Sequence, residues 1–219
     1  MIAAFFLARS REQADRIENV FLLSRPSNTR IQSFLNQQET ASFSYPGVGV
    51  SQGCHAPAGY VVDHNRVRLG IGNEVWDRGK QAIQQWKMFD MPWVQLCWPN
   101  APVELKSTVG IAIRHYGFWS LNAARIVYCI AEDTRFGFAY GTLHEHGECG
   151  EERFLVERRP DEDAVWYDLF AFSRPHAALA KIGRPLARSL QKKFARGSMN
   201  AMVRATATPI PAAPPIARR

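Results

Sequence analysis

The sequence lacks the features by which several large classes of protein are recognised. Its four cysteines lie far apart and form no C-x-x-C pair, the spacing typical of zinc and dithiol redox sites. No apolar stretch approaches the roughly 20 residues that a membrane-spanning helix needs. The short apolar start is followed by Arg9 and Arg11 rather than by a signal-peptide cleavage site. We therefore expect a soluble, cytoplasmic protein whose thiols are reduced.

Motifs that bind common cofactors are also missing. There is no phosphate-cradling loop, nucleophile elbow or internal repeat, and G-I-G-N-E-V at Gly70 is too short for a dinucleotide fingerprint. Residue types that bind metals gather at His144, His146 and Cys149, but they offer three ligands from one turn without a distant fourth. The sequence therefore predicts no cofactor and no metal, and an exposed polar turn at this point.

Acidic residues are absent from one end of the chain. Positions 169–219 contain no Asp or Glu but ten of the 27 Lys and Arg residues, so that 17 cations face 20 acids in the remainder. Such a basic segment can contact the phosphates of a membrane or of nucleic acid. Five of its cations share one side of a predicted helix: Lys181, Arg184, Arg188, Lys192 and Arg196.

The chain has enough apolar sequence to form a core, with 46% hydrophobic residues and six tryptophans in 219 positions. Capping signals and apolar periodicity predict one helix over residues 10–23 and a second that Ser27 or Asn28 caps. A strand is predicted over residues 60–69, and a helix capped by Asn73 follows it.

Strand patterns then dominate, over residues 93–98, 107–115, 124–131, 135–143, 152–158 and 164–172. Their short connections favour antiparallel pairing. One amphipathic helix follows, from Pro175 to about Met202. Its predicted apolar side consists of Leu179, Ile182, Leu186, Leu190 and Phe194.

Residues 136–154 form the stretch around which the rest is arranged, two strands joined by a polar turn. Period-2 alternation places Phe138 and Tyr140 on one side of the first strand, and Gly137, Ala139 and Gly141 on the other. Because glycine weakens a strand interior, we expect another element to press closely against the bare side. The C-terminal helix is the expected partner.

This order of elements predicts an α+β fold of the helix-grip type, in which a curved antiparallel sheet wraps around a long C-terminal helix. Space that side chains leave unfilled between sheet and helix would form a pocket. We expect an N-terminal helical extension over residues 1–42, the helix-grip domain over 43–204 and a disordered Pro/Ala-rich tail over 205–219.

Several segments together resemble an uncharacterised family, a domain of unknown function found in bacteria and plants. The most specific are F-G-F-A-Y-G-T-L at 136–143 and G-E-E-R-F at 150–154. Further matching segments are 45–51, 57–60, 69–72, 86–89, 122–128, His146 and 172–175. The element order is also similar to the helix-grip superfamily of START, polyketide-cyclase and birch-pollen-allergen-like (SRPBCC) proteins, a similarity that implies a cavity for apolar ligands.

The aromatic residues supply candidates for the lining of such a pocket, although aromatic stripes also form ordinary core. The candidates are Tyr60, Trp76, Trp86, Tyr140, Phe154, Trp166 and Phe170.

Glu151 and Glu152 are the candidate acids, because they point to opposite faces of their strand and one can enter the cavity beside Phe154. A carboxyl group among aromatics has a raised pKa and can act as a general acid or base, with Tyr140 or His146 as counterpart. The alternative is a structural ion pair with Arg125 or another cation.

Three functions follow from these observations. The first is binding of a small, largely apolar molecule between sheet and helix. The second is a cyclase, isomerase or hydrolase that uses an inward glutamate in the same cavity. The third is contact of the basic helix with an anionic membrane or nucleic acid.

Overall fold

Antiparallel strands form the centre of the described chain, which in this computed structural model comprises residues 21–98, 100–159, 161–175 and 184–207. They form one sheet in the order β2-β8-β7-β6-β5-β4-β3, with β1 beside β5. The bounds are β1 (Phe21–Leu22), β2 (Val61–Ile71), β3 (Val94–Cys97), β4 (Thr108–Arg114), β5 (Trp119–Ala131), β6 (Arg135–Thr142), β7 (Glu148–Arg159) and β8 (Ala164–Pro175).

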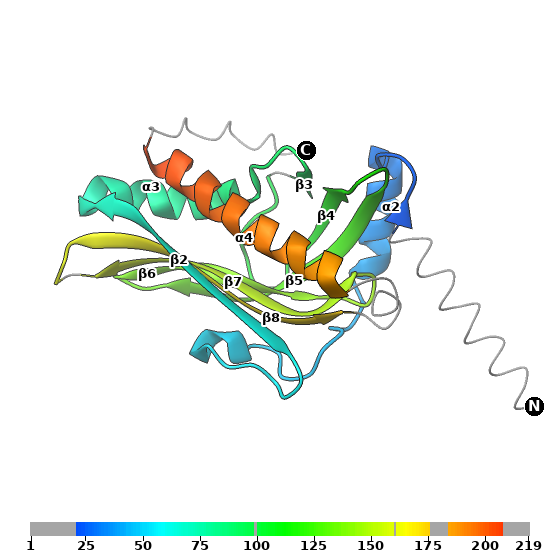
Figure 1. Ribbon diagram of the computed structural model, residues 1–219, viewed down its shortest axis with the longest axis horizontal. Coiled ribbons are helices and arrows are strands. Elements are labelled where there is room, and N and C mark those ends of the chain that lie inside the picture. Colours follow the sequence, from blue (N-terminus) through cyan, green and yellow to red (C-terminus); the bar gives the residue numbers. More distant parts are fainter. Residues whose placement is uncertain (1–20, 99, 160, 176–183, 208–219) are drawn as a thin grey trace, which may run out of the picture.

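Helix α4 (Arg184–Ala207) lies across one face of this curved sheet, beside α3 (Gly72–Gln84) and the short 3-10 helix η2 (Lys87–Phe89) (Figure 1). This inner face carries the largest hydrophobic cluster, in which Phe138, Tyr140 and Phe154 of the sheet pack with Trp86 and Phe89. The α+β helix-grip prediction is confirmed.

The outer face is covered as well. Helix α2 (Asn28–Gln38) buries Ile31, Phe34 and Leu35 against β3, β4 and β5, and Ser27 caps it by accepting a hydrogen bond from the Arg30 N–H (3.2 Å). The segment 43–60, which contains η1 (Val50–Gly53), covers β7 and β8 and buries Tyr45. Figure 1 shows this segment on the opposite side of the sheet from α4.

The predicted contact between the bare stripe and the C-terminal helix is wrong. The face of β6 that meets the inner core carries Phe138 and Tyr140. On the other face, a Cβ added to Gly141 would lie 2.1 Å from the Tyr45 hydroxyl oxygen. The close partner of Gly141 is therefore the ring of Tyr45 in the 43–60 segment, because α4 packs on the bulky side.

Several predicted boundaries also shift. Phe21 and Leu22 belong to a strand, whereas residues 10–20 of the first predicted helix lie outside the described residues. Asn73 does not cap α3, because the helix begins at Gly72 and the capping position is Ile71. Pro175 ends β8, because the strand pairing with β7 continues to that residue.

The C-terminal helix is described from Arg184 and continues to Ala207, beyond the predicted end at Met202. Leu179, Ile182, Lys181 and positions 208–219 of the predicted tail lie outside the described residues. No described helix is both long enough and apolar enough to cross a bilayer.

Candidate functional site

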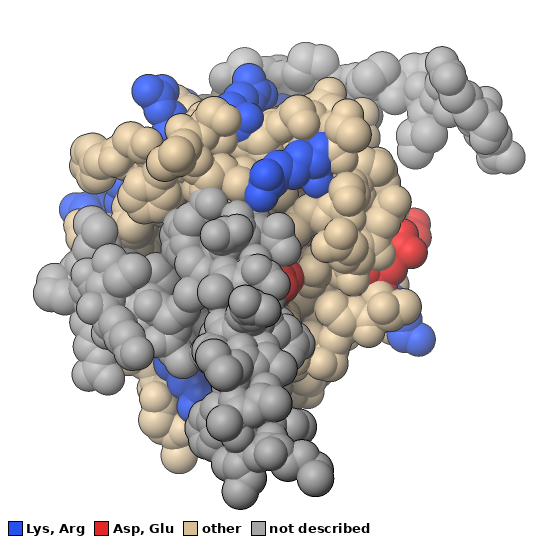
Figure 2. Space-filling view, turned by 90° about the vertical axis from the view of Figure 1, so that its right-hand side faces the viewer, with Lys and Arg blue, Asp and Glu red and all other residues tan. Residues whose placement is uncertain are grey.

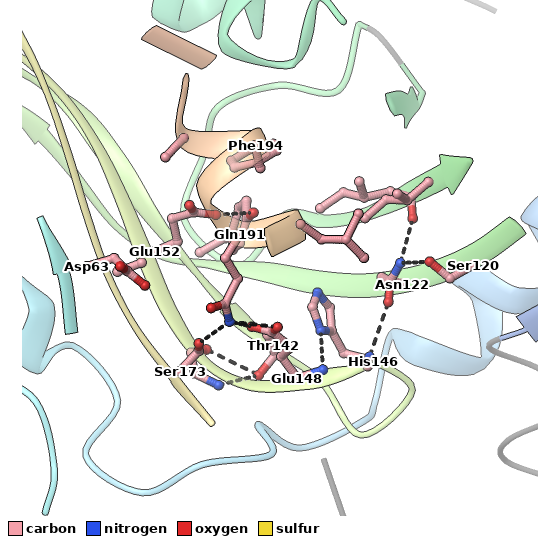
Figure 3. Close-up of a pocket in the computed structure, with 18 of the residues that line it drawn as sticks. Asp63, Ser120, Asn122, Thr142, His146, Glu148, Glu152, Ser173, Gln191 and Phe194 are labelled. Atoms are coloured by element: carbon pink, nitrogen blue, oxygen red, sulfur yellow. Dashed lines mark hydrogen bonds between the residues drawn. The ribbon is translucent and has the colours of Figure 1, made fainter. Parts of the chain in front are cut away.

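A cavity of about 270 Å³ lies between the sheet and α4. Figure 3 shows part of its lining, which includes Thr142 and Glu152 of the sheet and Phe194 of α4. The apolar lining includes Phe89, Trp93, Ile111, Ile113, Phe118, Leu169, Ala171, Leu190, Phe194 and Ala195. The polar lining includes Asp63, His115, Ser120, Asn122, Tyr140, Thr142, His146, Glu148, Glu152, Ser173 and Gln191.

Small residues explain why a hollow remains here. One row across the sheet pairs Asp63 with Ala171, and Ala171 with Glu152. The next row pairs Ser173 with Gly150. Ala171, Ser173 and Gly150 all line the cavity. The floor under α4 therefore has little side-chain volume, whereas other core positions of the inner face carry large rings that fill the space.

Tyr140 and Glu152 form a hydrogen-bonded pair on this floor, since β6 and β7 place them opposite each other. The Tyr140 hydroxyl donates to Glu152 Oε2 at 2.6 Å. Burial raises the pKa of Glu152 to about 7; the bond from Tyr140 opposes this, and the negative charges of Glu148 and Asp63 add to it. Burial and the Glu152 charge raise the pKa of Tyr140 well above its usual value. Glu152 can therefore gain or lose a proton near neutral pH.

A second polar group ties α4 to the sheet. Gln191 Nε2 donates to Glu148 Oε1 (2.7 Å), to Glu148 Oε2 (2.8 Å) and to Ser173 Oγ (2.9 Å). Its amide oxygen accepts from Arg188 (2.7 Å), whose guanidinium also donates to both carboxylate oxygens of Asp63. Burial raises the pKa of Glu148. Because Gln191 and Arg188 of α4 bond to the carboxylates of Glu148 and Asp63, the position of the helix depends on the ionisation of these two side chains.

Polar residues of β5 line the end of the cavity near the β6–β7 turn. The Asn122 side-chain amide donates to Ser120 Oγ (2.9 Å) and its oxygen accepts from the Gly147 N–H (3.1 Å). His115 Nε2 lies 2.9 Å from Ser120 Oγ, and burial lowers its pKa. His146 Nδ1 accepts from the Glu148 N–H (3.0 Å). Figure 3 shows His146 and Asn122 at this end, away from Asp63.

Glu151 lies on the opposite face of β7, as the alternation predicted. Its carboxylate accepts from the Tyr45 hydroxyl (2.6 Å), the Gly49 N–H (2.7 Å) and the Ser51 N–H (3.1 Å). The buried Arg153 on the same face pairs with Asp168 at 2.8 Å. This side of the sheet fixes the 43–60 segment, and among the two candidate acids Glu152 carries its carboxyl group toward the cavity.

The structure places the seven aromatic candidates in three different regions. Tyr140 lines the cavity. Trp76, Trp86 and Phe154 belong to the inner core. Tyr60 and Phe170 pack on the outer face, against Phe172 and His64 respectively, and Trp166 lies under the Arg66 guanidinium.

Two further predictions concern Arg125 and the turn that contains His144 and Cys149. Arg125 does not pair with the inward glutamate, because its guanidinium donates to the carbonyl oxygens of Gln38, Glu39 and Ala41; the predicted pairing with Arg125 is wrong. Cys149 packs in the outer-face cluster, whereas His144 bonds to Ser42 Oγ (3.0 Å). No group of three or more metal-ligand side chains occurs among the described residues.

The basic side of the C-terminal helix is partly engaged. Arg188 faces β2 and pairs with Asp63. Lys192 and Arg196 are exposed; Lys181 lies outside the described residues, as does the side chain of Arg184. Figure 2 shows that Lys and Arg predominate over small acidic areas on the described surface of one side. A membrane or nucleic-acid contact through this helix stays a prediction.

Several lining residues were not among the sequence-based candidates. Glu148 could have been found, because it shares the face of Glu152 at an even spacing along the strand. Gln191 could have been found on the helix side of Leu190 and Phe194. Asp63 carried no such signal, since only the pairing of β2 with β8 places it beside Ala171.

The sequence matches the family DUF1990, described as a domain of unknown function, over residues 44–201. It is 34% identical to the UPF0548 protein of Dictyostelium discoideum over 206 residues, which cover 85% of this chain and 95% of that protein. It is also 34% identical to the UPF0548 protein of Deinococcus radiodurans over 197 residues (85% and 98% covered). The corresponding values for the Arabidopsis thaliana UPF0548 protein are 32% over 197 residues (82% and 94%).

Solved structures overlap with this fold at lower similarity. Hypothetical protein jhp0584 from Helicobacter pylori gives a TM-score of 0.49 at 13% identity, covering 75% of this chain and 96% of that chain. Human STARD10 gives a TM-score of 0.42 at 10% identity, covering 84% and 81%.

Proposed function

The chain belongs to the DUF1990 family, and we propose that it binds a small, largely apolar molecule in the cavity between the sheet and α4. The observation that carries the proposal is the hollow of about 270 Å³ inside an otherwise packed inner face. Protein interiors are close-packed, and a concave site with apolar walls and a few polar groups is the usual form of a small-molecule site.

The walls and the floor of the cavity differ in kind. The rings of Phe89, Trp93, Phe118 and Phe194 offer apolar surface, whereas Tyr140, Glu152 and Gln191 offer hydrogen-bonding groups. Removing about 200 Å² of apolar ligand surface from water stabilises a complex by about 5 kcal/mol before ordering costs. The polar floor would then fix the orientation of the ligand.

The test uses N-phenyl-1-naphthylamine, a neutral fluorophore that brightens in apolar surroundings, and the full chain. Ala171 lies on the cavity floor, and Ala171→Phe should fill the hollow and weaken binding at least tenfold. Ala131→Phe is the matched control, because Ala131 is exposed at the end of β5. Equal binding by Ala171→Phe and the native chain would show that the fluorophore sits elsewhere and would refute the proposal.

A second candidate function is catalysis in the same cavity, and the Tyr140–Glu152 pair favours it. A carboxyl group whose pKa is about 7 can transfer a proton at neutral pH, and His146 lies in the same lining. Turnover of any bound molecule should then follow the ionisation of Glu152 and disappear in Glu152→Gln, while binding of the fluorophore persists. Turnover that survives in this variant would remove Glu152 from the chemistry.

The predicted compartment is still the cytoplasm, and the cysteines support this expectation. Cys54, Cys97, Cys129 and Cys149 are all free thiols in the structure, the state that a reducing compartment maintains.

A further inference from the structure

We infer that the molecule held in this cavity carries a protonated amine on its apolar body. The inference rests on the proposed function and adds the charge of the ligand to it. It follows from how charges are distributed over the lining of the cavity.

The floor carries an excess of carboxylates. Asp63 on β2 and Glu148 and Glu152 on β7 all line the cavity, and the one guanidinium that meets them, that of Arg188, is bonded to Asp63. Glu148 and Glu152 make their described hydrogen bonds with neutral groups, the amide of Gln191 and the hydroxyl of Tyr140. The charge of Arg188 also lowers the pKa of Glu148, but this one guanidinium is shared by three carboxylates, so that negative charge exceeds positive charge on the floor.

Their mutual effect is visible in their ionisation. Beyond burial, the charges of Glu148 and Asp63 raise the pKa of Glu152, against the bond from Tyr140. The pKa of Glu148 is also raised, mainly by burial; Gln191, Ser173 and Arg188 oppose this, and the charge of Asp63 adds to it. A cation placed among these groups would stabilise their charged forms, whereas an anion would be repelled. Neutral apolar atoms alone would leave the repulsion unchanged.

The remaining charged groups lie elsewhere around the cavity. Lys192 on α4 lines it but is exposed, and Lys193 lies over the Trp93 ring (4.7 Å). His115 and His146 occupy the end near β5, where burial and Lys193 lower the pKa of His115. The floor is thus acidic although the chain as a whole carries a formal charge of +7.

Aromatic walls suit the same ligand. Phe89 and Phe194 pack with ring centroids 5.5 Å apart, and Trp93 and Phe194 lie edge to face at 6.5 Å. Rings attract cations through their faces and pack against apolar bodies. An ammonium group near Glu152 and Glu148, with its carbon body against these rings, satisfies both parts of the lining.

The experiment compares three probes with one apolar body: 2-(1-naphthyl)ethylamine, 2-(1-naphthyl)ethanol and 1-naphthaleneacetic acid. Calorimetric titration of the full chain at pH 8, where Glu152 is largely ionised, should rank amine above alcohol by tenfold or more, and alcohol above acid. At pH 5.5 the preference for the amine should shrink, because Glu152 is then protonated whereas the amine keeps its charge.

Variants locate the preference. The double variant Glu148→Gln, Glu152→Gln should bind amine and alcohol within about twofold of each other. Glu74→Gln, a one-charge change at a side chain that is 89% exposed on α3, should leave the native ranking intact.

Each contrary result has a distinct meaning. An alcohol that binds as tightly as the amine, or an amine preference unchanged in the double variant, would overturn the charge assignment while apolar binding stands. Failure of all three probes in a chain that binds N-phenyl-1-naphthylamine would also overturn it. Exclusion of that fluorophore from the cavity would instead remove the proposed function.

Discussion

Glu151 and Glu152 are neighbours in the chain, yet strand alternation sends them into two different environments. On the outer face, Glu151 accepts three hydrogen bonds from the Tyr45 hydroxyl and from the N–H groups of Gly49 and Ser51. On the inner face, Glu152 has one described donor, Tyr140, and opens onto a cavity. A carboxylate whose hydrogen bonds are satisfied fixes structure, whereas one beside a hollow is available to a ligand.

The charged residues beside them repeat the contrast. The Arg153–Asp168 pair on the outer face is buried, with side chains that are 4% and 6% exposed. The Arg188–Asp63 pair at the inner face is 34% and 27% exposed. Removing one partner should therefore cost far more stability on the outer face, because a buried charge that loses its partner has no water to replace it.

The largest expected effect breaks the outer network. Glu151→Ala leaves the buried Tyr45 hydroxyl and two backbone N–H groups without their acceptor, and we expect it to lower the free energy of unfolding by about 3–5 kcal/mol. Urea denaturation measures the loss. Glu74→Ala, at an exposed position of α3, should change it by less than about 0.5 kcal/mol. A loss below 1 kcal/mol in Glu151→Ala would mean that the outer face does not depend on this carboxylate.

The pH dependence of stability sharpens the comparison on the inner face. The pKa of Glu152 is raised from 4.5 to about 7 in the folded chain, so the folded state binds more protons than the unfolded state between these values. The contribution of Glu152 to the free energy of unfolding is fully present below pH 4.5 and is lost as the pH rises through 7.

We expect this loss to reach about 2 kcal/mol, less than the full shift implies because Glu152 is partly exposed. Glu152→Gln should flatten the curve, and Glu148, whose pKa is also raised, should account for the slope that persists. Urea denaturation at intervals between pH 4.5 and 7.5 provides the measurement. If the free energy of unfolding of Glu152→Gln changed with pH as steeply as that of the native chain, the raised pKa of Glu152 would be contradicted.

The smallest effect concerns the exposed ion pair. Arg188→Gln should lower the free energy of unfolding by about 0.5–1 kcal/mol, since partly exposed pairs contribute little. Arg196→Gln serves as the matched control on α4, because the described hydrogen bond of Arg196 is to its own helix, at Lys192 O. A loss of several kcal/mol in Arg188→Gln would place this pair in the same class as Arg153–Asp168.

Much of the architecture could be predicted from sequence because it depends on local patterns. Alternation indicated strands over residues 135–143 and 152–158, where the structure has Arg135–Thr142 and Glu148–Arg159, and the same period separated Glu151 from Glu152. One of the two glutamates was expected to enter the cavity beside Phe154, and the structure has Glu152 and Phe154 on the inner side. Ser27 was one of two proposed caps for α2 and is the one that forms.

The errors share a cause, which is that packing partners are set by distant segments. The bare stripe of β6 indicated close contact, but Tyr45, nearly 100 positions away, is the residue that fills the space over Gly141. The small residues under α4 are instead Gly150, Ala171 and Ser173, which lie on two other strands. Six of the seven aromatic candidates lie in filled core or on the outer face, because ring size predicts burial but not the presence of a hollow beside it.

The sequence by itself determined the elements, their antiparallel order and the side of the strand on which each glutamate lies, because these follow from periodicities within a few residues. Only the tertiary structure decided which face the C-terminal helix covers, that Asp63 joins Glu152 across Ala171, and that a hollow persists between them. Those features depend on strand pairing and on the volume left over when all side chains are placed together, and neither quantity is contained in any single segment of the chain.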